Sequence, residues 1–244
     1  MRATSPETAG RTGIERLELA DWRRRVAELY AEVRELAAAD PVAAHIRWRE
    51  VREALYRSHP SSPVALDRRP GFRALHFPYD PKLRFELPLA PDEPAASVGE
   101  APPAGEPPPA GEPPPAGEAE VDVGLRLPIS TGRPLGFDRV GWLEVPFEDG
   151  ARRLALFWLP EYSGGLFLPF RDGTNGHETY GGGRYLLDTA KGADLGGDSA
   201  RGTITIDFNF AYQPSCAFDP RWSCPLSPPE NRLDLEIRVG ERLA

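Results

Sequence analysis

The chain has 244 residues, of which 40% are hydrophobic, so it is long and apolar enough to bury a core and is not a disordered protein. Its formal charge of −8 comes mostly from residues 90–120, which carry seven acidic and no basic side chains, and the remainder lacks the clustered basic surface typical of nucleic-acid binding. No segment approaches the roughly 18 consecutive apolar residues of a membrane helix, and residues 1–13 lack the apolar run of a secretory signal. We therefore expect a cytoplasmic protein with no nucleic-acid and no membrane partner.

Two amphipathic helices are predicted within residues 12–58. The first starts at Thr12 and Glu15, which have capping-box spacing. Its apolar side chains recur in steps of three and four residues: Trp22, Val26, Leu29, Val33 and Leu36. The second begins at Asp40, with Pro41 in the first helical position, and ends before His59-Pro60. Its expected apolar face consists of Val42, Ile46, Val51 and Leu55.

Residues 90–118 form a proline-rich insert that repeats with a period of six from Glu100, Glu106 and Glu112. This composition has no apolar face to bury, favours the polyproline II conformation and repels itself through its glutamates, which predicts a disordered spacer. A proline-recognition ligand for a partner domain is an alternative. Because early strands precede the insert and later strands follow it, we interpret it as an enlarged loop within one domain, 1–244.

After Pro60 the pattern changes to short apolar segments separated by proline and glycine, which is typical of an antiparallel β protein. The predicted strands are 72–77, 82–87, 121–129, 139–147, 151–159, 166–174, 177–187, 203–212 and 232–239. Residues 119–244 are thus the main β-rich part. The predicted fold class is α+β, with two N-terminal helices packed on a mainly antiparallel β-sheet body that forms a curved sheet, a barrel or a sandwich.

Asn175-Gly176 lies between two strand-like segments and is the preferred pair for a two-residue type I′ hairpin. That turn places Asp172 opposite Thr179, and Phe167 opposite Arg184. One face of the hairpin then collects apolar side chains, and the other collects Phe167, Arg171, Glu178, Tyr180 and Arg184. The last four are candidates for a functional surface.

A candidate ligand site follows if this polar face is the concave side of a curved sheet. It would consist of Arg171, Glu178, Tyr180, Arg184, Asp207 and Asn209. Paired arginines can hold a carboxylate or a phosphate through two-pronged hydrogen bonds, so we expect a small polar or anionic ligand. The competing interpretation is a solvated sheet face without function.

Two other classes of function remain open. A hydrolase-type enzyme would use Glu178 or Asp207 as general base, with Tyr180 or Arg184 stabilising negative charge. A protein-interaction module would engage a partner through the helices or the insert. Whether the chain is an enzyme is therefore undecided at this point.

The remaining motifs do not indicate a cofactor or a metal. Gly181-Gly182-Gly183 matches neither the P-loop nor the dinucleotide fingerprint and predicts a bulge or a close approach of another backbone. Cys216 and Cys224 lack further metal ligands nearby in sequence, so we interpret them as buried structural thiols. The alternative is a disulfide that closes this short loop, which would stabilise the protein by roughly 2–3 kcal/mol but is disfavoured in a reducing cytoplasm. A Cys–His nucleophile with His59, His76 or His177 has no support from spacing.

Several longer motifs resemble a known family. They are Asp21-Trp22-Arg23, the run from His59 to Pro63, the run from Phe77 to Asp80, the run from Leu168 to Asp172, the run from Glu178 to Tyr185, Asp207-Phe208-Asn209, Cys224-Pro225 and Pro229-Glu230-Asn231. Together they resemble the bacterial family named domain of unknown function 1684. The resemblance implies no catalytic residues, because the family has no established activity. Gln213 stands where the resemblance implies asparagine, and the proline-rich insert is unusual for the family.

Overall fold

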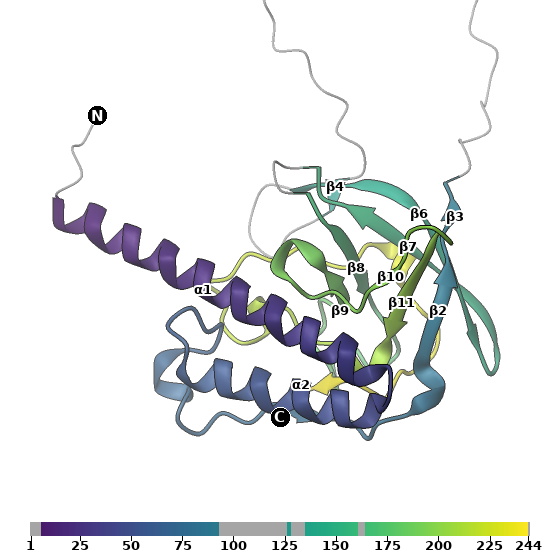
Figure 1. Ribbon diagram of the computed structural model, residues 1–244, viewed down its shortest axis with the longest axis horizontal. Coiled ribbons are helices and arrows are strands. Elements are labelled where there is room, and N and C mark those ends of the chain that lie inside the picture. Colours follow the sequence, from purple (N-terminus) through teal and green to yellow (C-terminus); the bar gives the residue numbers. More distant parts are fainter. Residues whose placement is uncertain (1–5, 93–125, 128–134, 161–163, 244) are drawn as a thin grey trace, which may run out of the picture.

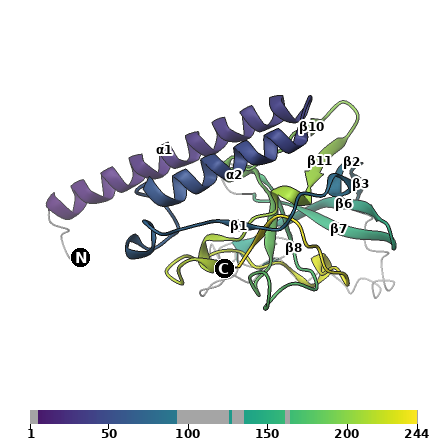
Figure 2. The same cartoon turned by 90° about the horizontal axis from the view of Figure 1, so that it is seen from below.

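The computed structural model describes residues 6–92, 126–127, 135–160 and 164–243. Helices α1 (Pro6–Ala37) and α2 (Pro41–Ser58) come first and lie side by side on one side of the β-strands (Figures 1 and 2). The predicted helix pair is therefore present, although α1 begins at Pro6 rather than at Thr12. Asp40 caps α2 as predicted, because its carboxylate accepts hydrogen bonds from the backbone amides of Val42 and Ala43.

The strands form small antiparallel sheets, and the fold is α+β as predicted, with no closed barrel among the described strands. The largest sheet has the order β3-β6-β7-β8-β9, and a second has the order β10-β11-β2. Pairs β1-β12 and β4-β5 complete the set. The bounds are β1 Leu75–His76, β2 Arg84–Pro88, β3 Ala90–Pro91, β4 Arg126–Leu127, β5 Leu135–Gly136, β6 Asp138–Phe147, β7 Gly150–Trp158, β8 Leu166–Phe170, β9 Arg184–Asp188, β10 Gly197–Asp198, β11 Thr203–Asp207 and β12 Glu241–Arg242.

The insert prediction is only partly covered by the structure. Residues 93–118 and most of the predicted strand 121–129 lie outside the described residues. The first two residues of the predicted insert belong instead to β3, where Ala90 pairs with Trp142 and Pro91 with Gly141.

The buried face of α2 differs from the predicted one. Val42 and Ile46 are 46% and 49% exposed, whereas His45 and Trp48 are buried. The α2 side chains that point into the protein are His45, Trp48, Arg52 and Tyr56, which recur in steps of three and four. The helical period was therefore right and the predicted face was right in part: Leu55 is buried and Val51 packs against the core, but Val42 and Ile46 are exposed. Near the start of α2 the aromatic and polar side chains are the ones that find partners beneath the helix.

The predicted two-residue hairpin at Asn175-Gly176 is wrong. Strand β8 does pair with β9, but Phe167 lies opposite Asp188, and residues 171–183 form a long connection. The segment after β8 pairs instead with the C-terminal part of the chain, since the Arg171 amide donates to the Asn231 carbonyl and the Gly173 amide donates to the Leu235 carbonyl. These long-range contacts override the local turn preference.

Within this connection the Asn175 side chain joins the residues before it to the residues after it by hydrogen bonds. Its amide nitrogen donates to the Thr179 hydroxyl and to the Tyr180 carbonyl, and its oxygen accepts from the Asp172 amide. Asn175 therefore stabilises the conformation of this connection through the hydrogen bonds of its side chain, and not by forming the two-residue hairpin turn.

The predicted strand 232–239 is also wrong as secondary structure, although its alternation of burial is present. Leu233, Ile237 and Val239 are buried, but no described strand pairs with this segment. The predicted strand 203–212 is shorter than expected, because β11 ends at Asp207 and a 3₁₀ turn, Phe208–Phe210, follows.

Proline in β8 explains how Asn231 enters the sheet. The β8–β9 register shifts between Leu168 and Pro169, and Pro169 has no amide to donate. The buried Asn231 side chain accepts from the Ala155 amide of β7 at 2.7 Å and donates to the carbonyls of Ala155 and Pro169 at 2.9 and 2.7 Å. One side-chain amide thus joins β7 to β8 beyond the two residue pairs that these strands share.

Candidate functional site

Arg184, the central residue of the sequence-predicted site, is completely buried and binds only protein atoms. Its guanidinium forms an ion pair with the equally buried Asp172 at 3.1 Å. It also donates to the backbone carbonyls of Ile237, Val239 and Glu241 at 2.8, 2.5 and 3.3 Å. Arg184 thus supplies hydrogen bonds to the backbone of residues 237–241 that a neighbouring strand would otherwise supply.

Asp207 and Asn209 do lie together, as predicted, but they too are completely buried. The Asn209 amide group bonds Asp207 at 2.7 Å and bridges to the backbone of Asp80, and Arg84 forms an ion pair with Asp207 at 3.3 Å. Burial raises the pKa of Asp207, against the opposing effect of Asn209 and Arg84. This cluster fixes the turn after β11 to the segment that precedes β2.

The three remaining predicted residues lie on the long connection and face different neighbours. Glu178 forms an ion pair with the exposed Arg238 at 2.9 Å. Arg171 donates to the Gly181 carbonyl. The Tyr180 phenol contacts the Cys216 thiol, and burial together with this thiol raises the pKa of Tyr180 to about 12. The six residues therefore form separate clusters and do not line one cavity.

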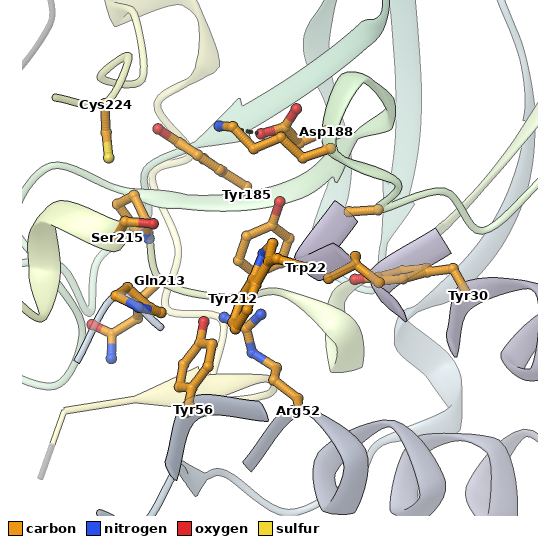
Figure 3. A pocket seen from close by; sticks show the side chains of 15 residues that line it. Trp22, Tyr30, Arg52, Tyr56, Tyr185, Asp188, Tyr212, Gln213, Ser215 and Cys224 are labelled. Atoms are coloured by element: carbon orange, nitrogen blue, oxygen red, sulfur yellow. Dashed lines mark hydrogen bonds and ion pairs between the residues drawn. The ribbon is translucent and has the colours of Figure 1, made fainter. Parts of the chain in front are cut away.

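A cavity of about 70 Å³ lies elsewhere, between the two helices and the edge of the sheet (Figure 3). This volume suits a few water molecules or one compact chemical group. Helix α1 contributes Trp22, Val26 and Tyr30, and α2 contributes Arg52 and Tyr56. The opposite wall consists of Tyr185, Asp188, Lys191, Ala193, Tyr212, Gln213, Pro214, Ser215 and Cys224, with Pro63 at the side.

Arg52 is the principal charge of the cavity. Its guanidinium lies 4.5 Å from the ring centre of Tyr56 and 4.6 Å from that of Tyr212, which places the cation between two aromatic faces. One of its terminal nitrogens forms an ion pair with Glu241 at 3.1 Å. Its Nε atom is buried and has no hydrogen-bond partner.

Four of the seven tyrosines of the chain line this cavity, and all four are protonated at neutral pH. Burial raises the pKa of Tyr30 to about 12, and it raises the pKa values of Tyr56, Tyr185 and Tyr212 well above their ordinary value. Each phenol can therefore donate a hydrogen bond. The Tyr185 hydroxyl already donates to the Pro225 carbonyl at 2.5 Å.

The Tyr30 hydroxyl differs from that of Tyr185, because it is buried and has no partner within hydrogen-bonding distance. Besides burial, which raises it, the Arg52 charge and the Trp48 indole act on the Tyr30 pKa, and both lower it; an indole N–H can only donate, so it leaves the phenol's own proton unused. Tyr30 thus resembles Arg52 in offering a donor that the protein itself leaves unused.

Lys191 and Asp188 form an ion pair at 2.8 Å beside the cavity, and the lysine side chain is about half exposed. The Gln213 backbone amide donates to Glu241 at 2.7 Å, and its side-chain oxygen accepts from the Tyr180 amide at 3.1 Å. Gln213 therefore connects the cavity wall to the long connection that carries Tyr180.

Sequence reasoning missed these cavity residues, although two signals pointed to them. Tyr30 and Tyr56 each follow a buried leucine in a helix, and a phenol at a core position needs a polar neighbour. Lys191 is one of only two lysines in the chain. In the part of the chain that the structure describes, no group of three or more His, Cys, Asp and Glu side chains could hold a metal ion. None of the described helices could cross a membrane.

The model of the family described as "Protein of unknown function (DUF1684)" matches residues 116–242, which is more than half of the chain. The chain belongs to this family. The DUF1684 match contains the sheet-side wall of the cavity, including Tyr185, Lys191, Tyr212 and Gln213, whereas α1 and α2 precede it.

A solved structure matches a larger share of the chain than the family model does. The chain is 26% identical to an uncharacterized protein of Haloarcula marismortui, whose solution NMR structure it matches with a TM-score of 0.50. The match covers 80% of this chain and 90% of that one. No curated protein matches the chain. The comparisons thus establish the family of the chain, and they indicate no activity.

Proposed function

We propose that this DUF1684 protein binds a small polar or anionic ligand in the cavity between its helices and its sheet. The observation that carries the proposal is the pair of unused donors, Arg52 Nε and Tyr30 Oη, in a cavity lined by protonated phenols. Buried polar groups in proteins nearly always have hydrogen-bond partners, so two unused donors in one cavity wall call for an acceptor.

Charge favours an anion over a cation at this position. Two cations, Arg52 and Lys191, line the cavity, against one anion, Asp188. Glu241, which does not line the cavity, neutralises part of the Arg52 charge through an ion pair with a terminal nitrogen of the guanidinium. This ion pair leaves the Nε atom of Arg52 without a partner. A carboxylate of the ligand could therefore accept from Nε and from a phenol without displacing Glu241.

Size restricts the ligand further. A cavity of about 70 Å³ accommodates a compact polar group and not a nucleotide. The Lys191 side chain is about half exposed, so the part of a longer ligand that does not fit in the cavity would extend into solvent beside the Lys191 ammonium group. Small mono- and dicarboxylic acids fit this description best.

The geometry does not favour the hydrolytic alternative at Glu178 or Asp207. The Glu178 carboxylate forms a surface ion pair with Arg238, and Asp207 is enclosed by Asn209 and Arg84. A general base must reach a substrate proton, and neither carboxylate lines the cavity. We therefore propose binding and not a reaction.

The test is a thermal-shift and calorimetric screen of acetate, glycolate, malonate, succinate and inorganic phosphate against the full chain. We expect at least one carboxylate to stabilise the protein. Tyr30→Phe removes one hydroxyl and should weaken that binding roughly tenfold, equivalent to about 1.4 kcal/mol. The double variant Arg52→Met with Glu241→Gln should abolish it without leaving a buried unpaired charge.

Matched controls exist for both kinds of side chain. Tyr79 also has a buried hydroxyl without a partner but lies outside the cavity, so Tyr79→Phe should bind as the unmodified protein does. Lys191→Gln removes one of the two cations that line the cavity and should also weaken carboxylate binding; Lys82→Gln, which removes a lysine outside the cavity, is its control. Binding that survives in the Arg52 and Tyr30 variants, or the absence of any carboxylate or phosphate binding, would contradict the proposal.

A further inference from the structure

Cys216 and Cys224 meet in the loop that forms one wall of the cavity. The Cys216 backbone amide donates to the Cys224 sulfur at 3.3 Å, and the two thiols hydrogen-bond each other. Both side chains are buried, at 9% and 5% exposure. The two residues are not joined by a disulfide.

The two thiols differ in what they face. Cys224 lines the cavity, beside Ser215 and Tyr185 (Figure 3), whereas Cys216 lies behind it against the Tyr180 phenol. A small molecule that enters the cavity therefore reaches Cys224 first. The thiol of Cys216 is then the nearest group that can react with a modified Cys224.

We propose that Cys216 and Cys224 form an oxidation site in which Cys224 reacts first with a peroxide and Cys216 completes a disulfide. The Cys224 thiolate attacks one peroxide oxygen, the O–O bond breaks, and a sulfenic acid and hydroxide form. The Cys216 thiolate then attacks the Cys224 sulfur and expels its hydroxide. The two thiol protons convert both hydroxides to water, so two thiols and one hydrogen peroxide give one disulfide and two waters.

The surroundings make this a slow site at neutral pH. The hydrogen bond from Cys216 and burial raise the pKa of the Cys224 thiol, and the Lys191 ammonium offsets only part of this effect. Because the thiolate is the reactive form, the rate of Cys224 oxidation should rise about tenfold for each unit of pH increase below the pKa of this thiol. Loop 216–224 is short and proline-containing, so the disulfide would join two positions that are already held in contact.

The experiment treats the reduced full chain with hydrogen peroxide and counts thiols with Ellman's reagent after unfolding. We expect the count to fall from two to none, and peptide mapping to find Cys216 joined to Cys224 within one chain. The oxidised protein should unfold at a higher denaturant concentration than the reduced one, since the bridge restricts the unfolded chain.

Single variants test the order of events with dimedone, which traps sulfenic acids. Cys216→Ser should accumulate a dimedone adduct on Cys224, and Cys224→Ser should give far less adduct on Cys216. Retention of both thiols in the folded chain, while a urea-unfolded sample oxidises, would overturn the proposal. Disulfides only between chains, or an adduct preferentially on Cys216, would overturn it equally.

Discussion

Asp172 and Arg184 form a completely buried ion pair that joins the connection after β8 to the C-terminal segment. One carboxylate oxygen of Asp172 accepts from Arg184 at 3.1 Å and from the Ile237 amide at 2.7 Å, and the other accepts from Thr174 at 2.7 Å. Arg184 in turn binds three carbonyls of residues 237–241. The pair thus supplies the hydrogen bonds that a neighbouring strand would otherwise supply.

The first prediction concerns the cost of breaking this pair. Arg184→Met should destabilise the protein by roughly 3–5 kcal/mol in urea unfolding, because it leaves a buried carboxylate without its counter-charge. The matched surface change, Arg238→Met, breaks exposed ion pairs with Glu178 and Glu236 and should cost less than about 1 kcal/mol. Similar costs for the two variants would show that the buried pair does not hold the C-terminal segment.

The second prediction concerns acid stability and rests on two buried histidines. Burial is the main cause that lowers the pKa values of His45 and His76 from 6.5 to about 3. The unfolded chain therefore binds protons more readily than the folded chain below pH 6.5, and stability should fall as the pH drops from about 6.5 to 3. The slope approaches at most about 1.4 kcal/mol per pH unit for each histidine.

Urea unfolding between pH 7 and pH 4 measures this dependence. Replacing both residues, His45→Phe with His76→Phe, should flatten the profile in that range. His177→Gln changes an exposed histidine and should leave the slope intact. An unchanged slope in the double variant would assign the acid sensitivity to other groups.

The third prediction tests which face of α2 is buried. Ile46→Gln should change the free energy of unfolding by no more than about 0.5 kcal/mol, since Ile46 is 49% exposed. Trp48→Ala should cost about 3–5 kcal/mol, because Trp48 is fully buried against Phe210 and His76. A larger cost for Ile46→Gln than for Trp48→Ala would show that the face with Val42 and Ile46 is the buried one, as the periodicity predicted.

The fourth prediction separates two neighbouring glycines. Gly183 has a φ of +100°, and a Cβ there would lie 2.6 Å from the Phe170 carbonyl oxygen. Gly183→Ala should therefore destabilise the protein by at least about 2 kcal/mol. A Cβ on Gly181 would meet nothing closer than 3.9 Å, so Gly181→Ala should be nearly neutral. Thermal unfolding of both variants tests the difference, and equal effects would argue against a close backbone approach at Gly183.

Several of the motifs on which the family resemblance was based occur at positions that hold the fold together. Pro169 and Asn231 meet between β7 and β8, Asp172 meets Arg184, and Asp207 meets Asn209. The sequence alone correctly indicated that these residue types matter. It assigned Arg184, Asp207 and Asn209 to a ligand, because a charged or amide side chain in a strand pattern has the same appearance whether it faces a ligand or the backbone of a distant segment.

Periodicity and capping by themselves determined that two helices precede an antiparallel β body, and that Asp40 starts the second helix. Those features depend on interactions within a few residues. The register of β8 with β9, the buried face of α2 and the cavity around Arg52 were decided by tertiary structure, because each depends on contacts between segments far apart in the chain. Arg52 appears as an ordinary surface cation in the helix, and only Tyr212 and Glu241, brought against it by folding, give it a role in a cavity.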